Sequence, residues 1–506
     1  MKIIETVILD CYTDEPSGYG VRPYLGTHQI HLSQALTYLG IDHYYLTIDD
    51  LRFITRGVSG DEYNSDISTL NTTNNCDNAL EIIQKAKLIY IIMGCFVDYK
   101  YFSTIPPKSD EVYEFLKLTK SRKILFYVLG TVDGISPDYQ NSKLRTIIDH
   151  VEFGNTYRYV IENNKHADIF PPNYDLLEKI SSSEPQIIQQ LKYPIIAEIE
   201  TGAGCNTPFC SFCIESVRKI TPSYRTPESI TSQIKTLYRT GVRYFRLGRQ
   251  PNFFQYQNQD ISQVHRLLAE IRDGCPNLSM LHIDNANIVS VISKNGIKII
   301  KEIVRYCTSG NIAPLGIESF DDNVRTTIRK TGTAEQAYKA ISIISEIGSE
   351  RGDDCLPKLL PGINLIYGLP SQTFSTHQTN LEYLAKILNN GLFTARLFFR
   401  KMTRPTGISF NDGPTSNDEY LKWFNDIVNL FVLPMQSRVY TVGKIIKNNR
   451  EVVLKDGNSY LRTLGTCPIR IKVIGNQLTP YNYYDVQITK NLDYRLLQGI
   501  VINQDY

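Results

Sequence analysis

ETGAGCNTPFCSFC, residues 200–213, places three of the ten cysteines of this chain within nine residues: Cys205, Cys210 and Cys213. Three thiolates on one short loop can bind three irons of a cubane cluster and leave the fourth iron open for reaction chemistry. A structural zinc site needs a fourth protein ligand, and the next candidates, His265 and Cys275, lie far along the chain. Incidental clustering of thiols is the third interpretation, and the spacing favours an iron–sulfur site over both alternatives.

The cysteine loop follows the first of six apolar segments that have the pattern of β-strands. These segments cover residues 195–200, 243–248, 280–284, 313–318, 363–368 and 394–400. Helical patterns lie between them, such as residues 228–239, where Ile230, Ile234 and Leu237 share one face behind Pro227 at a helix-start position. Six β/α repeats predict a partial (β/α)6 barrel with its chemistry at the carboxyl ends of the strands.

Phe212, directly before Cys213, completes a pattern that resembles the radical SAM superfamily. Members usually have three and then two residues between the cysteines, whereas the first gap here has four. The resemblance implies that Cys205, Cys210 and Cys213 hold a [4Fe-4S] cluster whose open iron binds S-adenosylmethionine (SAM), with Phe212 packed beside the adenine. It also implies that an electron from a donor such as ferredoxin or flavodoxin cleaves the sulfonium to methionine and a 5′-deoxyadenosyl radical.

The segment after the second strand, Gly248-Arg249-Gln250, departs from the superfamily pattern. Members usually place a glycine-rich loop there, which ends in an acid that holds the methionine amine. The acid is absent from this chain, so the resemblance implies that Arg249 and Gln250 reach the methionine carboxylate or a substrate instead. Residues 282–287, HIDNAN, give the third strand a polar tip suited to ligand contact.

Two further strand ends are similar to superfamily segments. Residues 315–319, LGIES, are similar to the Gly-Ile-Glu-Ser segment of radical SAM enzymes that have an extra N-terminal domain. A buried Glu318 needs partners, and we expect Glu318 and Ser319 to contact SAM through its ribose or amine. A structural ion pair of Glu318 with Arg329 is the alternative. Gly368, at the fifth strand end, is expected to let the backbone approach the adenine.

Residues 1–170 alternate short apolar segments with helical patterns. Strands at residues 3–10, 43–48, 87–94 and 123–130 predict a doubly wound, Rossmann-like domain with a parallel sheet. Such sheets bind ligands beyond the carboxyl ends of their strands, and these ends carry Asp10, Asp49, Asp50 and Cys95. Residues 171–192 form a polar connector, and the barrel domain is expected to cover residues 193–436.

A doubly wound domain ahead of a radical SAM barrel resembles the cobalamin-binding subclass. Residues 24–26, YLG, are similar to the start of that module. The resemblance makes cobalamin a possible cofactor, although the Asp-x-His-x-x-Gly signature is absent. His28 and His31 are interpreted as helix-surface residues rather than cobalt ligands. An archaeal family of radical SAM proteins looks similar at residues 18–26, 246–250 and 281–287.

A methylthiotransferase-like arrangement is the alternative for the first domain. Those enzymes hold a second cluster on three N-terminal cysteines, and Cys11, Cys76 and Cys95 offer three thiols here. Their spacing does not match that family, so the favoured interpretation is that they bind no metal.

Residues 437–506 are expected to form a small all-β, barrel-like domain. Strand patterns at residues 439–445, 451–454, 469–474 and 484–489 are separated by the turn signals Asn448-Asn449, Asp456-Gly457 and Gly475-Asn476. Residues 438–506 hold ten Lys and Arg against five Asp and Glu, interleaved with tyrosines. This combination suits the binding of single-stranded nucleic acid, through contacts of Lys and Arg with phosphates and stacking of Tyr on bases.

Composition limits the function further. The 506 residues carry 54 Lys and Arg against 52 Asp and Glu, a net charge of +2, which excludes a nucleic-acid binder that is basic over its whole surface. The 42% hydrophobic content excludes global disorder, and no apolar run is long enough to cross a bilayer. We therefore expect a cytoplasmic protein with no membrane partner.

The sequence as a whole predicts a radical SAM enzyme that methylates or methylthiolates an unactivated carbon of RNA or protein. Two alternatives stay open. One is a non-catalytic nucleic-acid-binding protein with a structural metal site, and the other is a radical SAM enzyme that acts on a small metabolite.

Overall fold

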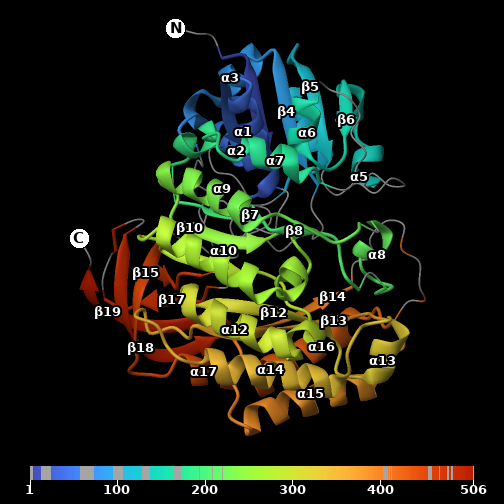
Figure 1. Ribbon diagram of the computed structural model, residues 1–506, viewed down its shortest axis with the longest axis vertical. Helices are drawn as coiled ribbons and strands as arrows, with labels where there is room; N and C mark the ends of the chain where they lie inside the picture. The colour runs from blue at the N-terminus through green and yellow to red at the C-terminus, as the bar shows by residue number, and fades with distance from the viewer. Residues whose placement is uncertain are drawn as a thin grey trace. The chain divides into compact units, whose positions relative to one another are not determined.

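The computed structural model describes residues 4–12, 24–56, 73–94, 106–127, 137–162, 172–192, 194–207, 209–218, 220–402, 408, 411, 413–453, 458–465, 468–475, 478–479 and 482–504. The chain divides into two compact units. The first unit holds residues 1–200, 228–245 and 274–277, and the second holds residues 201–227, 246–273 and 278–506. Figure 1 shows the helices and strands with the labels used below.

The N-terminal sheet has five parallel strands in the order β3-β1-β4-β5-β6 (Figure 1). The strands are β1 (Thr6–Asp10), β3 (His43–Thr47), β4 (Leu88–Met93), β5 (Arg122–Tyr127) and β6 (His150–Glu152). Every residue of β1 is buried because the strand lies between β3 and β4. This central position explains why the apolar run at the start of the chain is continuous rather than alternating. The predicted doubly wound domain is confirmed, although the short β6 was not predicted.

Helices follow these strands along the chain. They are α1 (Thr27–Tyr38), α2 (Ile48–Arg56), α3 (Ala79–Lys85), α4 (Ser109–Leu116), α5 (Pro137–Gln140), α6 (Thr156–Ile161) and α7 (Tyr174–Ile180). The interpretation of His28 and His31 as surface residues is wrong. Both lie in α1, whose residues are buried from Thr27 to Leu36, and the His31 ring meets Tyr157 edge-on at 5.6 Å. The polar residues of α1 suggested an exposed face, but the helix is buried on all sides from Thr27 to Leu36.

The partial barrel is confirmed. Its strands belong to two sheets with the orders β11-β10-β7-β2 and β12-β13-β14. The strands are β2 (Tyr24–Leu25), β7 (Ile196–Glu200), β10 (Tyr244–Gly248), β11 (Met280–Ile283), β12 (Asn311–Glu318), β13 (Leu359–Tyr367) and β14 (Arg396–Lys401). A parallel bridge between Ala286 and Leu315 continues the strand sequence from β11 to β12.

Helices alternate with these strands in the order expected for β/α repeats. They are α9 (Pro227–Arg239), α10 (Ile261–Gly274), α11 (Ile288–Ile292), α12 (Lys294–Tyr306), α13 (Asp322–Thr327), α14 (Ala334–Gly348), α15 (Phe374–Asn389) and α16 (Asn417–Ile427). Helix α14 begins with a capping box, in which the Thr333 side chain accepts from the Gln336 N–H and the Gln336 side chain accepts from the Thr333 N–H. Pro227 is the first residue of α9, as its sequence position predicted.

The C-terminal domain is a closed five-stranded barrel in the order β15-β16-β17-β19-β18. The strands are β15 (Ile445–Val453), β16 (Ser459–Arg462), β17 (Arg470–Val473), β18 (Tyr483–Asp493) and β19 (Leu496–Gln504). Its core includes Ile446, Leu461, Ile471, Val486 and Leu497, which alternate with residues of the opposite face. The predicted all-β domain is confirmed.

Two details of the C-terminal prediction are wrong. Residues 439–445 are not a strand, because Val439 ends helix α17 (Leu433–Val439) and β15 begins at Ile445. Asn448-Asn449 is not a hairpin turn but an irregularity within β15, where the register shifts between Ile446 and Asn449 and Asn448 has φ 54°. Asp456 and Gly457 lie outside the described residues.

Candidate functional site

Gly204 fixes the base of the cysteine loop. The loop leaves β8 (Gly202–Ala203) and is closed by the antiparallel partner β9 (Ser223–Tyr224). Gly204 has φ +81°, and a Cβ at this position would lie 2.5 Å from Ile220 O. Only glycine combines this left-handed backbone with so close an approach of two chain segments. The sequence therefore places Cys205 at the start of a loop whose two ends are held together.

The three cysteines lie on this one loop and are partly or fully buried. The Cys213 N–H donates to Cys210 O at 3.1 Å, and the Thr207 N–H donates to Cys205 Sγ at 3.4 Å. Burial raises the pKa of the Cys210 thiol and raises that of Cys213 to about 11. Both thiols are therefore protonated at neutral pH in this structure, and a bound metal would have to displace those protons.

The donor set of the loop fits a cluster with one open position. No group of three or more His, Cys, Asp and Glu side chains forms a ready-made metal site within the described part of the chain, and this includes the cysteine trio. The loop itself supplies three thiols, and its sequence holds no histidine and no fourth cysteine. Three soft donors without a fourth suit an iron–sulfur cluster better than structural zinc, which takes four protein ligands.

Glu318 and Lys330 form a buried ion pair close to the loop. Lys330 Nζ lies 3.1 Å from Glu318 Oε1, and Glu318 is 7% exposed. Gly316 makes room for the pair, because a Cβ there would lie 2.6 Å from Glu318 Oε1. The alternative that paired Glu318 with Arg329 named the wrong partner, since the pair forms with the next residue.

This ion pair is linked electrostatically to the cysteines. Burial opposes the charge on Lys330, but Glu318 and Cys210 outweigh it and raise the pKa of the Lys330 ammonium. Lys330 in turn lowers the pKa of Cys210 against the larger effect of burial. Glu318 has φ 66°, a left-handed conformation that is costly for a residue with a Cβ and is typical of functional positions.

Phe212 packs into a small apolar cluster rather than against solvent. Its partners are Val324, Ile328 and Leu369, and the Ser211 N–H beside it donates to Ile328 O at 3.0 Å. Lys330 Nζ lies 5.8 Å from the centre of the Phe212 ring. These contacts bring the cysteine loop, α13 and the segment after β13 together, and contact of Phe212 with an adenine stays a prediction.

Gln250 has a buried donor without a partner. The side chain is 2% exposed, and its Oε1 is hydrogen-bonded to the Thr201 hydroxyl. Its Nε2 has no hydrogen-bond partner. Gly248 O accepts from the Thr201 N–H at 3.2 Å, and Arg249 has φ 67° at the sharp turn after β10. A buried donor without a partner at a strand end favours a ligand that brings a hydrogen-bond acceptor to it.

The remaining predicted ligand contacts have structural partners. The Phe320 N–H donates to Asn380 Oδ1 at 2.7 Å, and the Ser319 hydroxyl donates to the same oxygen at 3.5 Å. Gly368 has φ +95°, and its N–H donates to Gln372 Oε1 at 2.8 Å. Both positions therefore serve turns of the backbone, and a role in SAM binding stays a prediction for each.

The polar tip of β11 divides into two kinds of residue. His282 is fully buried, its Nε2 lies 2.9 Å from Ser309 O, and burial lowers its pKa to about 4. Asn287 caps α11 by accepting from the Val289 N–H. These two residues are structural, whereas Asp284 forms an ion pair with Arg246 that sequence reasoning missed. Arg246 can pair with Asp284 because β10 and β11 are neighbours in the sheet, and the local sequence of neither strand indicates this pairing.

The carboxyl ends of the N-terminal sheet carry a buried polar network. The Tyr45 hydroxyl donates to Asp10 Oδ2 at 2.6 Å, and the Tyr12 hydroxyl donates to Asp49 Oδ2 at 2.8 Å. Arg52 donates to the same Asp49 at 3.0 Å. Polar side chains at this edge are the arrangement that doubly wound folds use for ligands.

The two described thiols of this first domain are poorly reactive. Cys11 and Cys76 are buried, burial raises the pKa of both thiols, and that of Cys76 reaches about 12. Cys95 lies outside the described residues. The favoured interpretation, in which these cysteines bind no metal, stays a prediction.

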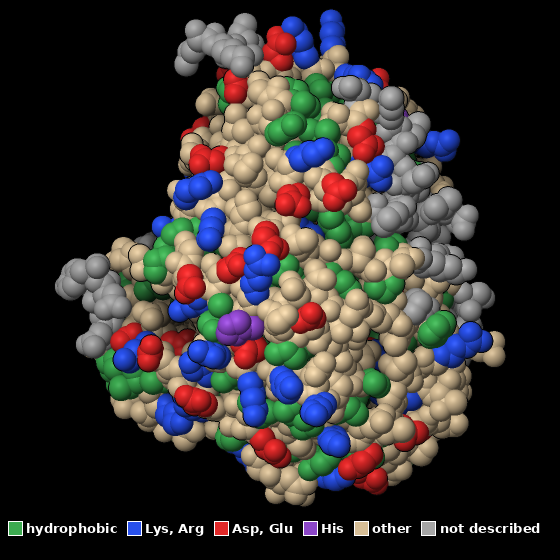
Figure 2. Space-filling view, viewed as in Figure 1, with side chains coloured by type: hydrophobic (Ala, Val, Ile, Leu, Met, Phe, Trp, Pro, Cys, Tyr) green, Lys and Arg blue, Asp and Glu red, His purple; other side chains and the backbone are tan. Residues whose placement is uncertain are grey.

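The basic, tyrosine-rich surface expected on the C-terminal domain is smaller than predicted. Tyr484 and Arg462 are each 2% exposed, and Tyr460 and Arg450 are also buried. These side chains are not available for stacking or for phosphate contacts at the surface. Figure 2 shows Lys and Arg side chains interspersed with Asp and Glu on the face in view.

The Radical SAM superfamily domain is matched over residues 199–384 of the chain, which include the cysteine loop and the ends of β10 to β13. A protein of Methanocaldococcus jannaschii, the uncharacterized MJ0274, is 30% identical over 99% of this chain and 94% of its own length. The chain belongs to the radical SAM superfamily. An uncharacterized protein of Archaeoglobus fulgidus is 29% identical over 95% of this radical SAM protein and 87% of its own length.

A solved structure supports the fold of this radical SAM protein. The apo form of the cobalamin-dependent SAM radical enzyme OxsB is similar with a TM-score of 0.50 and 13% identity. The similarity covers 84% of this chain and 55% of the OxsB chain, so the protein spans about half the length of that enzyme. In the part of the protein that the structure describes, no helix is both long and apolar enough to traverse a lipid bilayer.

Proposed function

We propose that this radical SAM protein binds a [4Fe-4S] cluster through Cys205, Cys210 and Cys213 and transfers a methyl or methylthio group to an unactivated carbon. The observation that carries the proposal is the set of three thiols on one loop that contains no histidine and no fourth cysteine, with the cationic Lys330 beside Cys210. When bound, the cluster and SAM supply a 5′-deoxyadenosyl radical, which can attack carbon that has no useful acidity.

Lys330 supplies a positive charge beside the cysteine loop, which favours an anionic group there. Its pKa is raised, so it is charged at neutral pH, and it interacts with Cys210. Loss of thiol protons on metal binding would put negative charge into a buried place, which is costly unless a cation compensates. Lys330 provides that compensation and is itself held in place by Glu318.

The partners of SAM in this proposal are Gln250, Glu318 and Phe212. The unsatisfied Nε2 of Gln250 supports a hydrogen bond to the methionine carboxylate, in place of the acid that the superfamily usually places after the second strand. Glu318, in its left-handed conformation, has a second carboxylate oxygen for the ribose or the amine. Phe212 presents an aromatic ring next to the last cysteine.

The RNA or protein substrate expected from the sequence loses support from the burial of Tyr460, Tyr484, Arg450 and Arg462, and the alternative of a small metabolite gains it. Cobalamin is part of the proposal only through the doubly wound first domain, whose strand ends carry the Asp10 and Asp49 network. The protein is proposed to work in the cytoplasm, where a reducing environment keeps the cluster thiols free.

Metal analysis of anaerobically reconstituted protein tests the proposal. Iron, sulfide, cobalt and zinc are measured per chain, together with 5′-deoxyadenosine release from SAM under dithionite. Iron and sulfide with SAM cleavage support it, and one zinc without SAM cleavage contradicts it. Cobalt that co-purifies supports the cobalamin part separately.

A further inference from the structure

The inner face of β14 carries two arginines on either side of an aromatic ring. Leu397 and Phe399 are buried, and the Phe399 ring packs on Tyr420 and Trp423 of α16. Since side chains alternate along a strand, Arg396, Phe398 and Arg400 face the other way, toward the interior of the barrel. Barrel interiors are usually filled with apolar branched side chains, so two arginines here require an explanation.

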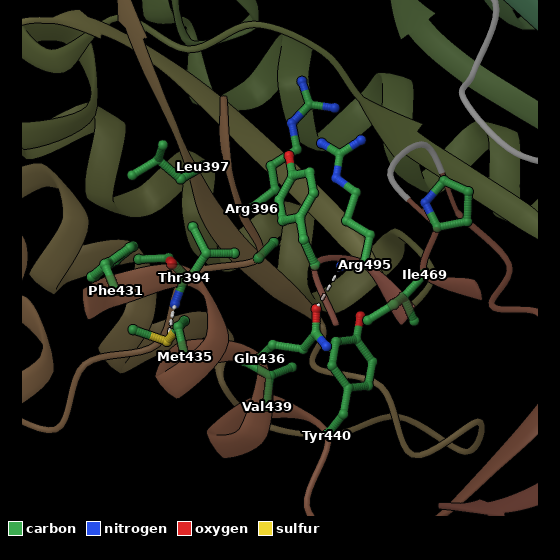
Figure 3. A pocket seen from close by; sticks show the side chains of 14 residues that line it. Thr394, Arg396, Leu397, Phe431, Met435, Gln436, Val439, Tyr440, Ile469 and Arg495 are labelled. Carbon is green, nitrogen blue, oxygen red and sulfur yellow. Dashed lines mark hydrogen bonds between the residues drawn. The ribbon is translucent and has the colours of Figure 1, made fainter. Parts of the chain in front are cut away.

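A third arginine joins them from the C-terminal domain. Arg495 lies in the turn between β18 and β19, and its Cζ is 4.6 Å from the centre of the Phe398 ring. Arg396 Cζ is 3.7 Å and Arg400 Cζ is 4.6 Å from the same centre. Figure 3 shows the guanidinium groups of Arg396 and Arg495 side by side, directed away from Val439 and Tyr440. The three arginines around Phe398 are called the arginine cluster below.

The charge of Arg396 is not balanced within the described part of the chain. Its Nε is buried without a hydrogen-bond partner, and no ion pair joins it to a described acid. Stacking on Phe398 offsets part of the cost of burying a cation. Stacking does not satisfy the N–H donors of the planar guanidinium group, whose geometry matches a phosphate or a carboxylate.

A second unsatisfied group lies on the neighbouring strand. Asn364 pairs with Phe398 in the parallel register of β13 and β14, and its Oδ1 is buried without a partner. Gly362 pairs with Arg396, and a Cβ there would lie 3.1 Å from Ile312 Cγ2 and 3.6 Å from Arg396 Cγ, so the glycine makes room for the Arg396 side chain. An unsatisfied donor and an unsatisfied acceptor on the same inner face point to a ligand that carries both an anionic group and a hydrogen-bond donor.

The arginine cluster is connected to the cysteine loop through one residue. Ile366 pairs with Arg400, and Ile366 belongs to the apolar cluster that holds Phe212, the neighbour of Cys213. Arg396 lies four residues from Arg400, about 13 Å along a strand at about 3.3 Å per residue. An anionic group held at Arg396 and Arg495 would leave the rest of a small molecule extending toward the thiols.

Gln436 holds Arg495 in position. The Arg495 N–H donates to Gln436 Oε1 at 3.0 Å (Figure 3). Gln436 Nε2 donates to Asp493 O at 2.9 Å. The cavity behind these residues has a volume of about 40 Å³, enough for water but not for a substrate. Because the guanidinium groups point away from this cavity (Figure 3), we place the ligand on their other side, and the hydrogen-bonded turn supports Arg495.

The C-terminal domain extends the cationic character with three arginines on one face of its barrel. Arg450 pairs with Arg462, which pairs with Arg470, across β15, β16 and β17. The Arg470 N–H donates to Arg495 O at 3.2 Å, which joins this row to the arginine cluster. Arg450 and Arg462 are buried, so a folded macromolecule could not reach them, and Arg470 is the end of the row that lies next to the arginine cluster.

We propose that the arginine cluster of Arg396, Arg400 and Arg495 is the substrate-recognition site of this enzyme and that the substrate is a small anionic molecule, bound through a phosphate or a carboxylate. The assignment of this anion-binding site as the substrate site rests on the proposed function. The binding itself is independent of the iron–sulfur cluster.

The test is binding of pyrophosphate and of citrate to the full-length protein by isothermal titration calorimetry, with sodium chloride matched for ionic strength. The two anions distinguish a phosphate site from a carboxylate site. Wild-type protein is expected to bind at least one of them saturably. Arg396→Gln is expected to weaken that binding about tenfold or more, because it removes a charge-assisted hydrogen bond.

Lys401→Gln is the matched control. Lys401 lies on the same strand and the opposite face, where it is exposed at the strand end, and the substitution also removes one positive charge. It is expected to leave anion binding unchanged. Arg396→Lys is the second variant, because it keeps the charge but loses the planar fork, and an intermediate affinity is expected. Melting temperatures check that the variants are folded.

Three outcomes would overturn the inference: no saturable binding of either anion, equal losses in Arg396→Gln and Lys401→Gln, or tight binding of a single-stranded oligonucleotide that Arg396→Gln abolishes while small anions do not bind. SAM cleavage by the wild-type protein separates this test from the proposed function. Cleavage without anion binding removes only the substrate site, and anion binding without a cluster or cleavage removes the proposed reaction.

Discussion

Lys330 Nζ lies 3.1 Å from Glu318 Oε1, in a pair whose side chains are 13% and 9% exposed, directly beside the loop of the three cysteines. The pair joins the end of β12 to the segment after α13 and places one cation next to Cys210. A buried ion pair of this kind contributes little stability over an apolar pair, but breaking it is costly. In the proposed function, the cation of this pair would compensate the negative charge of metal-bound thiolates.

Lys330→Met is expected to destabilise the apo protein by about 3–5 kcal/mol, because it leaves the Glu318 carboxylate buried without its partner. Chemical denaturation measures this change. The double variant Glu318→Gln with Lys330→Met is expected to be less destabilised than the sum of the two single variants, since both remove the same contact. Additive effects would show that the two side chains do not interact. Iron content after reconstitution is also expected to fall in Lys330→Met.

Gly204→Ala is expected to prevent cluster assembly, because the new Cβ would meet Ile220 O at 2.5 Å and shift the start of the cysteine loop. Gly241→Ala is the matched control, since Gly241 also has positive φ but has open space around it. The control is expected to cost about 1–2 kcal/mol from backbone strain alone and to keep its iron. Equal iron content in the two variants would contradict this account of the loop.

The stability of the apo protein is expected to fall as pH rises from about 9 toward 11. The Cys213 thiol has its ordinary pKa of 9.0 in the unfolded chain, and burial raises it to about 11 in the fold. The unfolded state therefore releases its proton first, so stability is complete below pH 9 and is lost through this window, by at most about 1.4 kcal/mol per pH unit for one group. Cys213→Ser is expected to have a shallower slope in urea unfolding at pH 8 to 10.5, and identical slopes would contradict the assignment.

Gln250→Leu is expected to weaken SAM binding by about tenfold, because the Nε2 donor proposed to meet the methionine carboxylate is lost. Equilibrium binding of SAM to the reconstituted protein measures this effect. Gln259→Leu is a control on a polar residue between β10 and α10 that has no proposed role at the site. A loss of cluster rather than of SAM affinity in Gln250→Leu would mean that Gln250 supports the loop instead.

The sequence predicted the parts of the fold that local patterns determine. The six barrel strands and the cysteine loop were visible because apolar strands end in polar or glycine residues at regular intervals. The bulge at Asn448 was not visible, since Asn-Asn has the same chemistry in a hairpin turn and in an irregular strand. Burial of His28 and His31 depends on what packs around α1, which the sequence of the helix does not contain.

The sequence names Cys205, Cys210 and Cys213 as candidate ligands from their spacing, and this assignment stays a prediction. The residues that support the loop were not predicted. Lys330 was not predicted as the partner of Glu318, and its choice over Arg329 follows from how the chain turns after α13. The arginine cluster joins β14 to the turn between β18 and β19, nearly one hundred residues apart, and no local pattern connects them.

The most direct measurement of the central claim is iron and sulfide per chain in anaerobically reconstituted protein, for the wild type, Cys210→Ala and Cys355→Ser. Cys355 is a partly buried free thiol outside the loop and controls for loss of any one cysteine. We expect about four irons and four sulfides in the wild type and in Cys355→Ser, and a loss of both in Cys210→Ala. Retention of the full iron content by Cys210→Ala would contradict the claim that the three-thiol loop holds the cluster.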